Sequence, residues 1–260
     1  MRYQIETDPR TAFFGIAALL LAVSITVTIA WCASMSAMDE MSMPGGWAMS
    51  MTWMRMPGQT WLDAAASFLG MWIVMMVAMM LPSLLPKLWR YLQATGQRAG
   101  PLITLVGVGY FFVWALFGMA AFPLGVMLAA IEMQHPPVAR AVPIAVGVVV
   151  LSAGVLQFTA WKAHHLACCR EMPSCCAPRA NAGSALRYGL RLGRHCSYCC
   201  ANRTAVLLVI GVMDLRAMVV VTAAIPIERL AMDARRAARG IGVVVVGAGL
   251  FLIARAVALA

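Results

Sequence analysis

Side chains that carry sulfur are concentrated in two segments of this sequence, and they are the residues best suited to chemistry. The chain has 8 cysteines, and all but Cys32 fall within residues 162–203. A second segment, residues 35–58, is rich in methionine. Thiolate and thioether sulfurs are soft ligands that select Cu(I), and thiolates also bind zinc or iron–sulfur clusters. The two segments therefore predict soft-metal chemistry.

The cysteine-rich segment has the spacing of a metal site. Cys196 and Cys199 form a C-x-x-C pair, which can bring two thiolates to one ion, and nearby histidines add imidazole ligands. A reducing cytosol keeps thiols free, so clustered cysteines there favour a metal site over a disulfide framework. The predicted ligands in this segment are His165, Cys168, Cys169, His195, Cys196, Cys199 and Cys200.

The methionine-rich segment predicts a Cu(I)-collecting loop. A thioether needs no deprotonation and forms no disulfide, so it suits an acidic or oxidising compartment. The methionines form two quartets, and the turn sequence 44–46 between them could face one toward the other. The quartets are Met35, Met38, Met41 and Met43, and Met49, Met51, Met54 and Met56. The alternative is a loop lying on lipid headgroups, anchored by Trp47, Trp53 and Trp61.

Further methionines follow a helical period inside apolar stretches. Met71, Met75 and Met79 recur at i, i+4 and i+8, which places them on one helix face, flanked by Met76 and Met80. Such a stripe could pass Cu(I) between sites, or it could be ordinary packing. The predicted ligands in this group are Met71, Met75, Met79, Met80 and Met213.

Met213 stands in the sequence GVMDLRAM, beside two ionisable residues within an apolar run. Asp214 and Arg216 are costly at such depth unless they face the bundle interior or water. At i and i+2 they cannot pair on one helix. Each therefore needs a partner elsewhere, or the helix is broken at this point.

The composition places these residues in a membrane. Hydrophobic residues make up 62% of the chain and charged residues 12%, against roughly 45–50% and 25% in ordinary soluble domains. We expect an all-α membrane protein, a polytopic bundle of about six transmembrane helices forming one domain over residues 1–260. The apolar stretches lie near residues 11–33, 61–82, 101–131, 141–161, 204–227 and 241–259. No basic run is interleaved with aromatic residues, which argues against a nucleic-acid partner.

The distribution of Lys and Arg predicts the orientation. With the N-terminus in the cytosol, the inner segments carry twice as many basic residues as the outer ones, as the positive-inside rule requires. Six spans then place both termini inside, the methionine-rich loop (35–60) outside and the cysteine-rich loop (162–203) inside. Residues 228–240 are basic for the outer loop that this topology makes them.

Several motifs together resemble a bacterial family of predicted metal-binding integral membrane proteins, sometimes labelled copper chaperones. The similar stretches are AMMLP at 78–82, KAHHLACCR at 162–170, GRHCSYCC at 193–200 and GVMDLRAM at 211–218, followed by Glu228. His165 stands where the family has cysteine, and Asp214 where it has asparagine. The resemblance implies a multi-pass protein of the bacterial inner membrane with a metal site built from the cysteine motifs.

Three functions remain open at this point. The first is Cu(I) capture, transfer or transport, with the lipid bilayer, the metal ion and another copper protein or membrane complex as partners. The second is a membrane thiol–disulfide oxidoreductase using Cys168/Cys169 or Cys196/Cys199. The third is a subunit or assembly factor held together by structural zinc. The glycine loop of ATPases and the hydrolase motifs G-x-S-x-G and H-E-x-x-H are absent, so we expect no enzyme.

Overall fold

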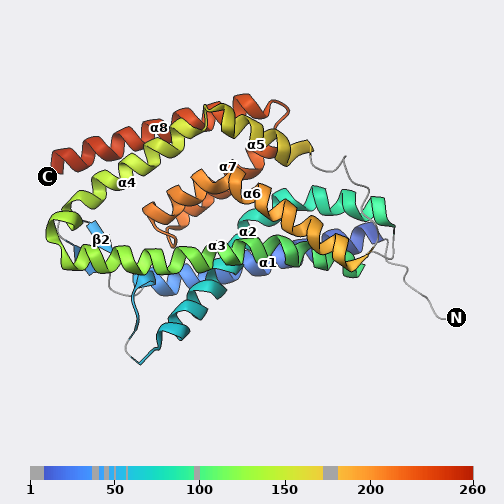
Figure 1. The fold of residues 1–260 in the computed structure, drawn as a ribbon, viewed down its shortest axis with the longest axis horizontal. Coiled ribbons are helices and arrows are strands. Elements are labelled where there is room, and N and C mark those ends of the chain that lie inside the picture. Colours follow the sequence, from blue (N-terminus) through green and yellow to red (C-terminus); the bar gives the residue numbers. More distant parts are fainter. Residues whose placement is uncertain are drawn as a thin grey trace.

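The computed structural model describes residues 9–36, 41–43, 47–49, 51–56, 58–96, 100–171 and 181–259. These ranges are helical apart from a small hairpin and short connections (Figure 1). Met38, Cys175, Cys176 and the turn at 44–46 lie outside them. The elements are α1 (Pro9–Ser36), β1 (Met41–Met43), β2 (Trp47–Met49), η1 (Met51–Trp53), α2 (Trp61–Thr95), α3 (Gly100–Gln134), α4 (Pro136–Leu156), α5 (Ala160–Glu171), α6 (Ala182–Ile210), α7 (Leu215–Leu230) and α8 (Ala234–Leu259).

The expected all-α membrane class is confirmed. Among the described helices, 5 are long and apolar enough to cross a bilayer. They are α1, α2, α3, α4 and α8. A crossing helix needs about 20 apolar residues, and each of these provides them.

The stretch expected as a fifth span, 204–227, is not one helix. It contains the end of α6, a break at residues 211–214, and most of α7. Gly211 ends α6 with a φ of 138°, and the Asp214 side chain caps α7 by accepting hydrogen bonds from the amides of Arg216 and Ala217. The carboxylate is exposed and serves as an N-cap, which is why the chain tolerates it in an apolar run. The helix break that was expected as one way to accommodate Asp214 and Arg216 is therefore present.

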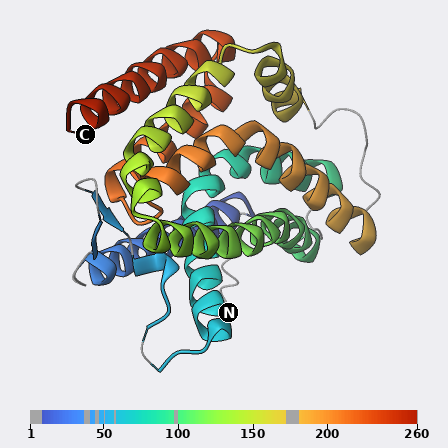
Figure 2. The ribbon, with the colours of Figure 1, turned by 60° about the vertical axis from the view of Figure 1, so that its left-hand side comes forward.

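The broken stretch forms a helical hairpin inside the bundle. In Figure 1, α6 runs leftward from the end of the molecule near α5, and α7 returns toward that end. The α6–α7 hairpin contacts α3 and α4 through α6, and α2 and α8 through α7. Figure 2 shows it between the α1–α3 layer and the α4–α8 pair. We call the end of the bundle where α5 lies the α5 end. The opposite end, where β1 and β2 lie, is the β-hairpin end.

The return of α7 corrects the expected position of residues 228–240. They were expected on the side opposite the cysteine-rich loop, but they lie beside α5. Arg170 donates a hydrogen bond to the carbonyl oxygen of Ala231 at 2.8 Å, and Ala238 packs with Leu166 and Cys169 of α5. Within the described residues, five helices long and apolar enough to cross a membrane and one returning hairpin stand in place of the six expected spans, so the basic residues of this segment lie at the α5 end.

Glycines bring α3 and α6 into close contact. A Cβ added at Gly189 would lie 2.3 Å from the carbonyl oxygen of Val106, and one at Gly193 would lie 2.8 Å from that of Tyr110. The spacing of these two glycines is the small-xxx-small pattern that lets membrane helices approach. The contact is important for the site because Cys196 follows Gly193 by one turn on α6, and Tyr110 lies on α3.

The methionine-rich segment is partly a packed structure and not simply a polar loop. β1 and β2 pair antiparallel with Met41 opposite Met49, so one residue of each expected quartet meets its counterpart across the strands. Met43 and Met49 are nevertheless buried against Ala129 and Ala139, near the α3–α4 turn. The side chain of Trp47 donates a hydrogen bond to the carbonyl oxygen of Ala139 at 2.9 Å. Two methionines of the expected Cu(I)-collecting loop, Met43 and Met49, are thus engaged in packing.

Candidate metal centre

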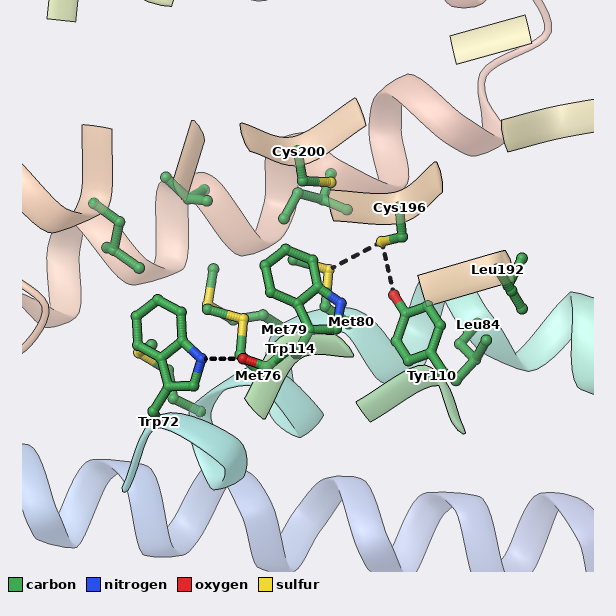
Figure 3. Packing of buried hydrophobic residues seen from close by; sticks show 14 of the residues in the cluster. Trp72, Met76, Met79, Met80, Leu84, Tyr110, Trp114, Leu192, Cys196 and Cys200 are labelled. Atoms are coloured by element: carbon green, nitrogen blue, oxygen red, sulfur yellow. Dashed lines mark hydrogen bonds between the residues drawn. The ribbon is translucent and has the colours of Figure 1, made fainter. Parts of the chain in front are cut away.

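The centre of the site is a pair of cysteines one turn apart on α6. Cys196 and Cys200 are four positions apart, which places both thiols on the face turned toward α2 and α3. Both side chains are fully buried. Figure 3 shows Cys196 pointing toward Met80 of α2 and Tyr110 of α3. The Cys196 sulfur lies 3.9 Å from the Met80 sulfur and 2.8 Å from the Tyr110 hydroxyl oxygen.

Arg229, near the end of α7, joins both thiols. One guanidinium nitrogen lies 2.9 Å from the sulfur of Cys196 and 3.1 Å from that of Cys200. Another nitrogen of the same group donates to the hydroxyl of Ser83 at 3.0 Å. A guanidinium presents its donors in a rigid fork, so one residue can hold two sulfurs in a fixed arrangement. A cation in this position favours the thiolate form of its neighbours.

Buried positive charges outnumber buried negative charges around this pair of cysteines. Glu228 is completely buried and forms ion pairs with Lys162, at 3.3 Å, and with Arg203. Gln157 donates a further hydrogen bond to its carboxylate at 2.9 Å. The three buried cations Lys162, Arg203 and Arg229 thus face one carboxylate in this part of the described chain. Because unpaired buried charge is costly, the surplus favours one or two thiolates at the centre.

A second cysteine contact extends the site toward α5. Cys169 is buried, its thiol donates to the carbonyl oxygen of His195 at 3.2 Å, and the Cys199 thiol lies nearby. The hydrogen bond from Cys199, followed by the nearby Arg229 and Lys87 cations, lowers the pKa of Cys169 to about 7 against the effect of burial. Cys199 and Cys196 are each also close enough to Cys200 for a side-chain hydrogen bond.

These contacts form a continuous series of sulfur atoms. The thiols of Cys169, Cys199, Cys200 and Cys196 are near neighbours in turn, and Cys196 lies 3.9 Å from the Met80 sulfur. The series connects α5, α6 and α2, and it brings together five of the residues predicted as ligands. A soft ion could move along it by exchanging one sulfur ligand for the next.

The predicted histidines lie at the margin of this series. His165 packs edge-on against Trp161 with ring centroids 4.5 Å apart, and burial followed by the nearby His164 and Lys162 lowers its pKa. The Nδ1 atoms of His165 and His195 are buried and have no hydrogen-bond partner in the described part of the chain. Cys168 lies away from the centre, with its sulfur 3.6 Å from His164 Nε2.

The predicted methionine stripe faces the interior. Met71, Met75 and Met79 are buried in one apolar cluster with the flanking Met76 and Met80, and this excludes contact with lipid. Of the five, Met80 contacts a thiol of the centre. Met213 does not reach the centre and lies in the break between α6 and α7.

Two important residues of the centre were not predicted from the sequence. Arg229 was assigned to an outer loop, although an arginine directly after Glu228 near the end of an apolar stretch signals a buried charge network. Tyr110 carries no such signal, because it lies in an apolar helix and only the α3–α6 crossing brings it to Cys196.

The coordination chemistry of the centre favours a low-coordinate soft ion. Within the described ranges, no group of three or more His, Cys, Asp and Glu residues is placed to hold a metal ion. Structural zinc requires four such ligands in a tetrahedron. Cys196, Cys200 and Met80 instead offer two thiols and a thioether, a combination that suits Cu(I).

A family model described as "PpoB2: Copper chaperone" matches residues 69–252, from the methionine stripe of α2 into α8. Comparison with curated proteins and with solved structures gave no match. The matched region is more than half of the chain and contains both cysteine motifs and the α6–α7 hairpin. The chain therefore belongs to the PpoB2 copper chaperone family, and its work is the handling of copper.

Proposed function

We propose that this chain binds and passes on Cu(I) within a membrane, with Cys196, Cys200 and Met80 as its principal ligands. The observation that carries the proposal is the shared guanidinium. Arg229 lies 2.9 and 3.1 Å from two thiol sulfurs, one of which is 3.9 Å from the Met80 thioether. Soft ligands and a balancing cation thus meet at one buried point.

The charge of the complex supports this assignment. Two thiolates and one Cu(I) carry a net charge of minus one, and the thioether adds none. Arg229 compensates this charge where water does not reach, because Cys196, Cys200 and Arg229 are all buried. A divalent ion on the same ligands would leave a neutral complex beside an uncompensated guanidinium.

The other two functions find less support. An exchange enzyme was expected to use Cys168/Cys169 or Cys196/Cys199, but the Arg229 guanidinium instead joins Cys196 to Cys200. Zinc lacks its four ligands among the described residues. We therefore propose that copper is carried as cargo, without a catalysed covalent reaction.

The basic residues give the proposed orientation. With residues 228–240 at the α5 end, the segments rich in Lys and Arg all lie at one end of the bundle, which the positive-inside rule places in the cytosol. The β-hairpin end then faces outward in a bacterial inner membrane. Copper moves between an outer donor or acceptor protein and the cysteines near α5.

Anaerobic titration tests the assignment. The full chain in detergent is loaded with Cu(I) and competed against a chromophoric Cu(I) chelator. We expect Cys196→Ser with Cys200→Ser to weaken binding at this centre at least about 100-fold, and Met80→Leu about tenfold, which corresponds to about 1.4 kcal/mol. X-ray absorption of the wild-type complex should show a sulfur-only shell.

Cys168→Ser is the matched control, because this thiol lies away from the centre. It should leave the affinity of the centre for Cu(I) unchanged. A folded Cys196/Cys200 double variant that keeps the wild-type Cu(I) affinity would refute the assignment. If the protein held zinc in place of copper and the Cys196/Cys200 double variant lost that zinc, the structural role would be supported instead.

A further inference from the structure

A second group of sulfur atoms converges away from the candidate centre. The thiol of Cys32, near the end of α1, lies 3.8 Å from the sulfur of Met213 and 3.9 Å from that of Met218. Cys32 is 1% exposed and Met218 5% exposed. Three soft donors from two distant parts of the chain thus meet inside the bundle, and Cys32 precedes the family match that begins at residue 69.

The break between α6 and α7 creates this convergence. In an uninterrupted helix, positions 213 and 218 would point about 140° apart, since each residue turns the helix by about 100°. Gly211 instead ends α6, and Asp214 restarts the chain as α7. Met213 then precedes the cap and Met218 lies one turn into the new helix, so that both sulfurs reach Cys32.

We propose that Cys32, Met213 and Met218 form a second Cu(I) site, a station on the copper path toward the centre at Cys196 and Cys200. The proposal rests on the proposed function in one respect, that the cargo is copper. Binding forms one copper–thiolate bond and two copper–thioether bonds. Copper stays in the +1 state, and the Cys32 thiol releases its proton to solvent.

The ligand set suits this position in the bundle. One thiolate, two neutral thioethers and Cu(I) make a complex with no net charge, which needs no buried counter-ion. The centre at Cys196 and Cys200 binds two thiolates and uses Arg229. The two sites therefore differ in charge as well as in place, and each matches its own surroundings.

Two helices connect the sites. Met218 lies in the first turn of α7 and Arg229 lies near its end, 11 positions further, so they are about 16 Å apart along the axis. On α2, the buried methionines from Met71 to Met80 cover a similar length, and they share one apolar cluster with Cys32, Met218 and Cys196. Trp31, next to Cys32, lies 4.0 Å from the Cβ position of Gly70, so the second site lies level with the beginning of the stripe.

The arrangement gives the methionine stripe a role. The second site lies toward the β-hairpin end of α2, and the cysteine centre lies toward the α5 end. Met75 and Met79 are thioethers at successive turns between them, where Cu(I) can exchange one ligand at a time. Thioethers are neutral, so they leave the positive charge of Cu(I) uncompensated. The thiolates at the two ends of the stripe compensate that charge, and the end sites are therefore more stable than the positions between them.

The test uses the full chain in detergent and Cu(I) alone as the probe. Met213→Leu with Met218→Leu removes two sulfurs while nearly conserving volume, so the bundle should still fold. It is made in the wild type and in the Cys196→Ser/Cys200→Ser background. Met119→Leu with Met127→Leu on the exposed face of α3 is the matched control. Cu(I) affinity is measured by chelator competition, bound copper by elemental analysis, and folding by thermal unfolding.

The Cys196→Ser/Cys200→Ser background should retain Cu(I) with a sulfur-only X-ray absorption shell. Adding the Met213/Met218 replacements should weaken that remaining binding at least tenfold, and Cys32→Ser should do the same. In the wild type, the Met213/Met218 variant should keep the binding that depends on Cys196 and Cys200. The Met119/Met127 control should change neither.

Unchanged Cu(I) affinity on adding Met213→Leu and Met218→Leu to the Cys196→Ser/Cys200→Ser background would overturn this site and leave the proposed function intact. Failure of the proposed function has a different signature. If the proposed function failed, introducing Cys196→Ser with Cys200→Ser into the wild-type chain would leave the bound copper unchanged. The Met213/Met218 variant would nevertheless lose bound copper.

Discussion

Single residues of the centre are held by charge as much as by packing. Cys196 and Cys200 are thiols of an ordinary helix turn, and what distinguishes them is the Arg229 guanidinium that contacts both. Arg229 follows Glu228, so one stretch of α7 supplies a cation to the sulfurs and an anion to Lys162 and Arg203. The electrostatics of the centre therefore depend on two adjacent residues near the end of α7.

Replacing Arg229 by lysine should separate charge from geometry. Arg229→Lys keeps the positive charge, but a lysine ammonium is a compact, strongly hydrated group without the planar fork that reaches both thiols and Ser83. We expect the affinity of the centre for Cu(I) to fall about tenfold, or about 1.4 kcal/mol. Chelator competition measures it.

Arg216→Lys is the control for this exchange, because Arg216 is exposed at the beginning of α7. It should leave binding at Cys196 and Cys200 unaltered. If Arg229→Lys bound Cu(I) as tightly as the wild type, charge alone would account for the role of Arg229, and the paired contact would be incidental.

The elements position these residues through close helix approach. α3 and α6 meet at glycines, and this contact brings Tyr110 to the sulfur of Cys196 at 2.8 Å. The α6–α7 hairpin turns back inside the bundle, which brings Arg229 to the same sulfur from a third helix. The proposed metal centre, made by α2, α3, α6 and α7, thus requires that all four keep their spacing.

Gly189→Ala should disturb that spacing. The added methyl group would lie 2.3 Å from the backbone oxygen of Val106, which cannot move aside as a flexible side chain would. We expect a loss of about 1–3 kcal/mol in the free energy of unfolding, the usual cost of overpacking. Reversible unfolding in detergent measures it, and weaker Cu(I) binding should accompany it.

Gly107→Ala provides the comparison on the neighbouring helix, because a Cβ there meets nothing within 4 Å. Alanine is the better helix former by about 1 kcal/mol, so this variant should be as stable as the wild type or more stable. Equal stability of the two alanine variants would show that α3 and α6 do not depend on close contact at Gly189.

At the scale of the whole molecule, the returning hairpin decides which segments share a side. α5, the turn 231–233 and the beginning of α8 lie together, as the Arg170–Ala231 hydrogen bond shows. The β1–β2 hairpin and the α3–α4 turn lie together at the other end, joined through Trp47 and Ala139. Within the described residues, five helices are long and apolar enough to cross a membrane between these two ends.

Cysteine labelling tests this topology. Met232→Cys and Arg55→Cys are placed singly in a chain whose Cys168, Cys175 and Cys176 are changed to serine, since both positions are exposed. In right-side-out membrane vesicles, a membrane-impermeant maleimide should label residue 55 directly and residue 232 only after permeabilisation. Six crossings would instead place residue 232 outside, and its direct labelling would refute the returning hairpin.

Local composition determined much of this protein. Apolar length predicted the five long apolar helices, because a helix that spans lipid must satisfy its own backbone and needs no information from its neighbours. Its bounds were less accurate, since α2 continues to Thr95, past the expected end at residue 82. The helical period of α2 placed its methionines on one face, and the i, i+3, i+4 spacing of Cys196, Cys199 and Cys200 placed three thiols within about one turn of α6. The choice of soft-metal chemistry followed from the residue types alone.

Only the tertiary structure decided which of these groups meet. By hydropathy, the apolar run 204–227 is predicted to be one span, yet Gly211 and Asp214 divide it. A hydropathy profile does not detect the helix cap that Asp214 provides. That division turns α7 back, brings Arg229 to the thiols and places Met213 and Met218 beside Cys32, across more than 180 positions of sequence. Contacts between distant segments depend on how helices pack, and packing depends on the shapes of all the side chains between them, which no local pattern records.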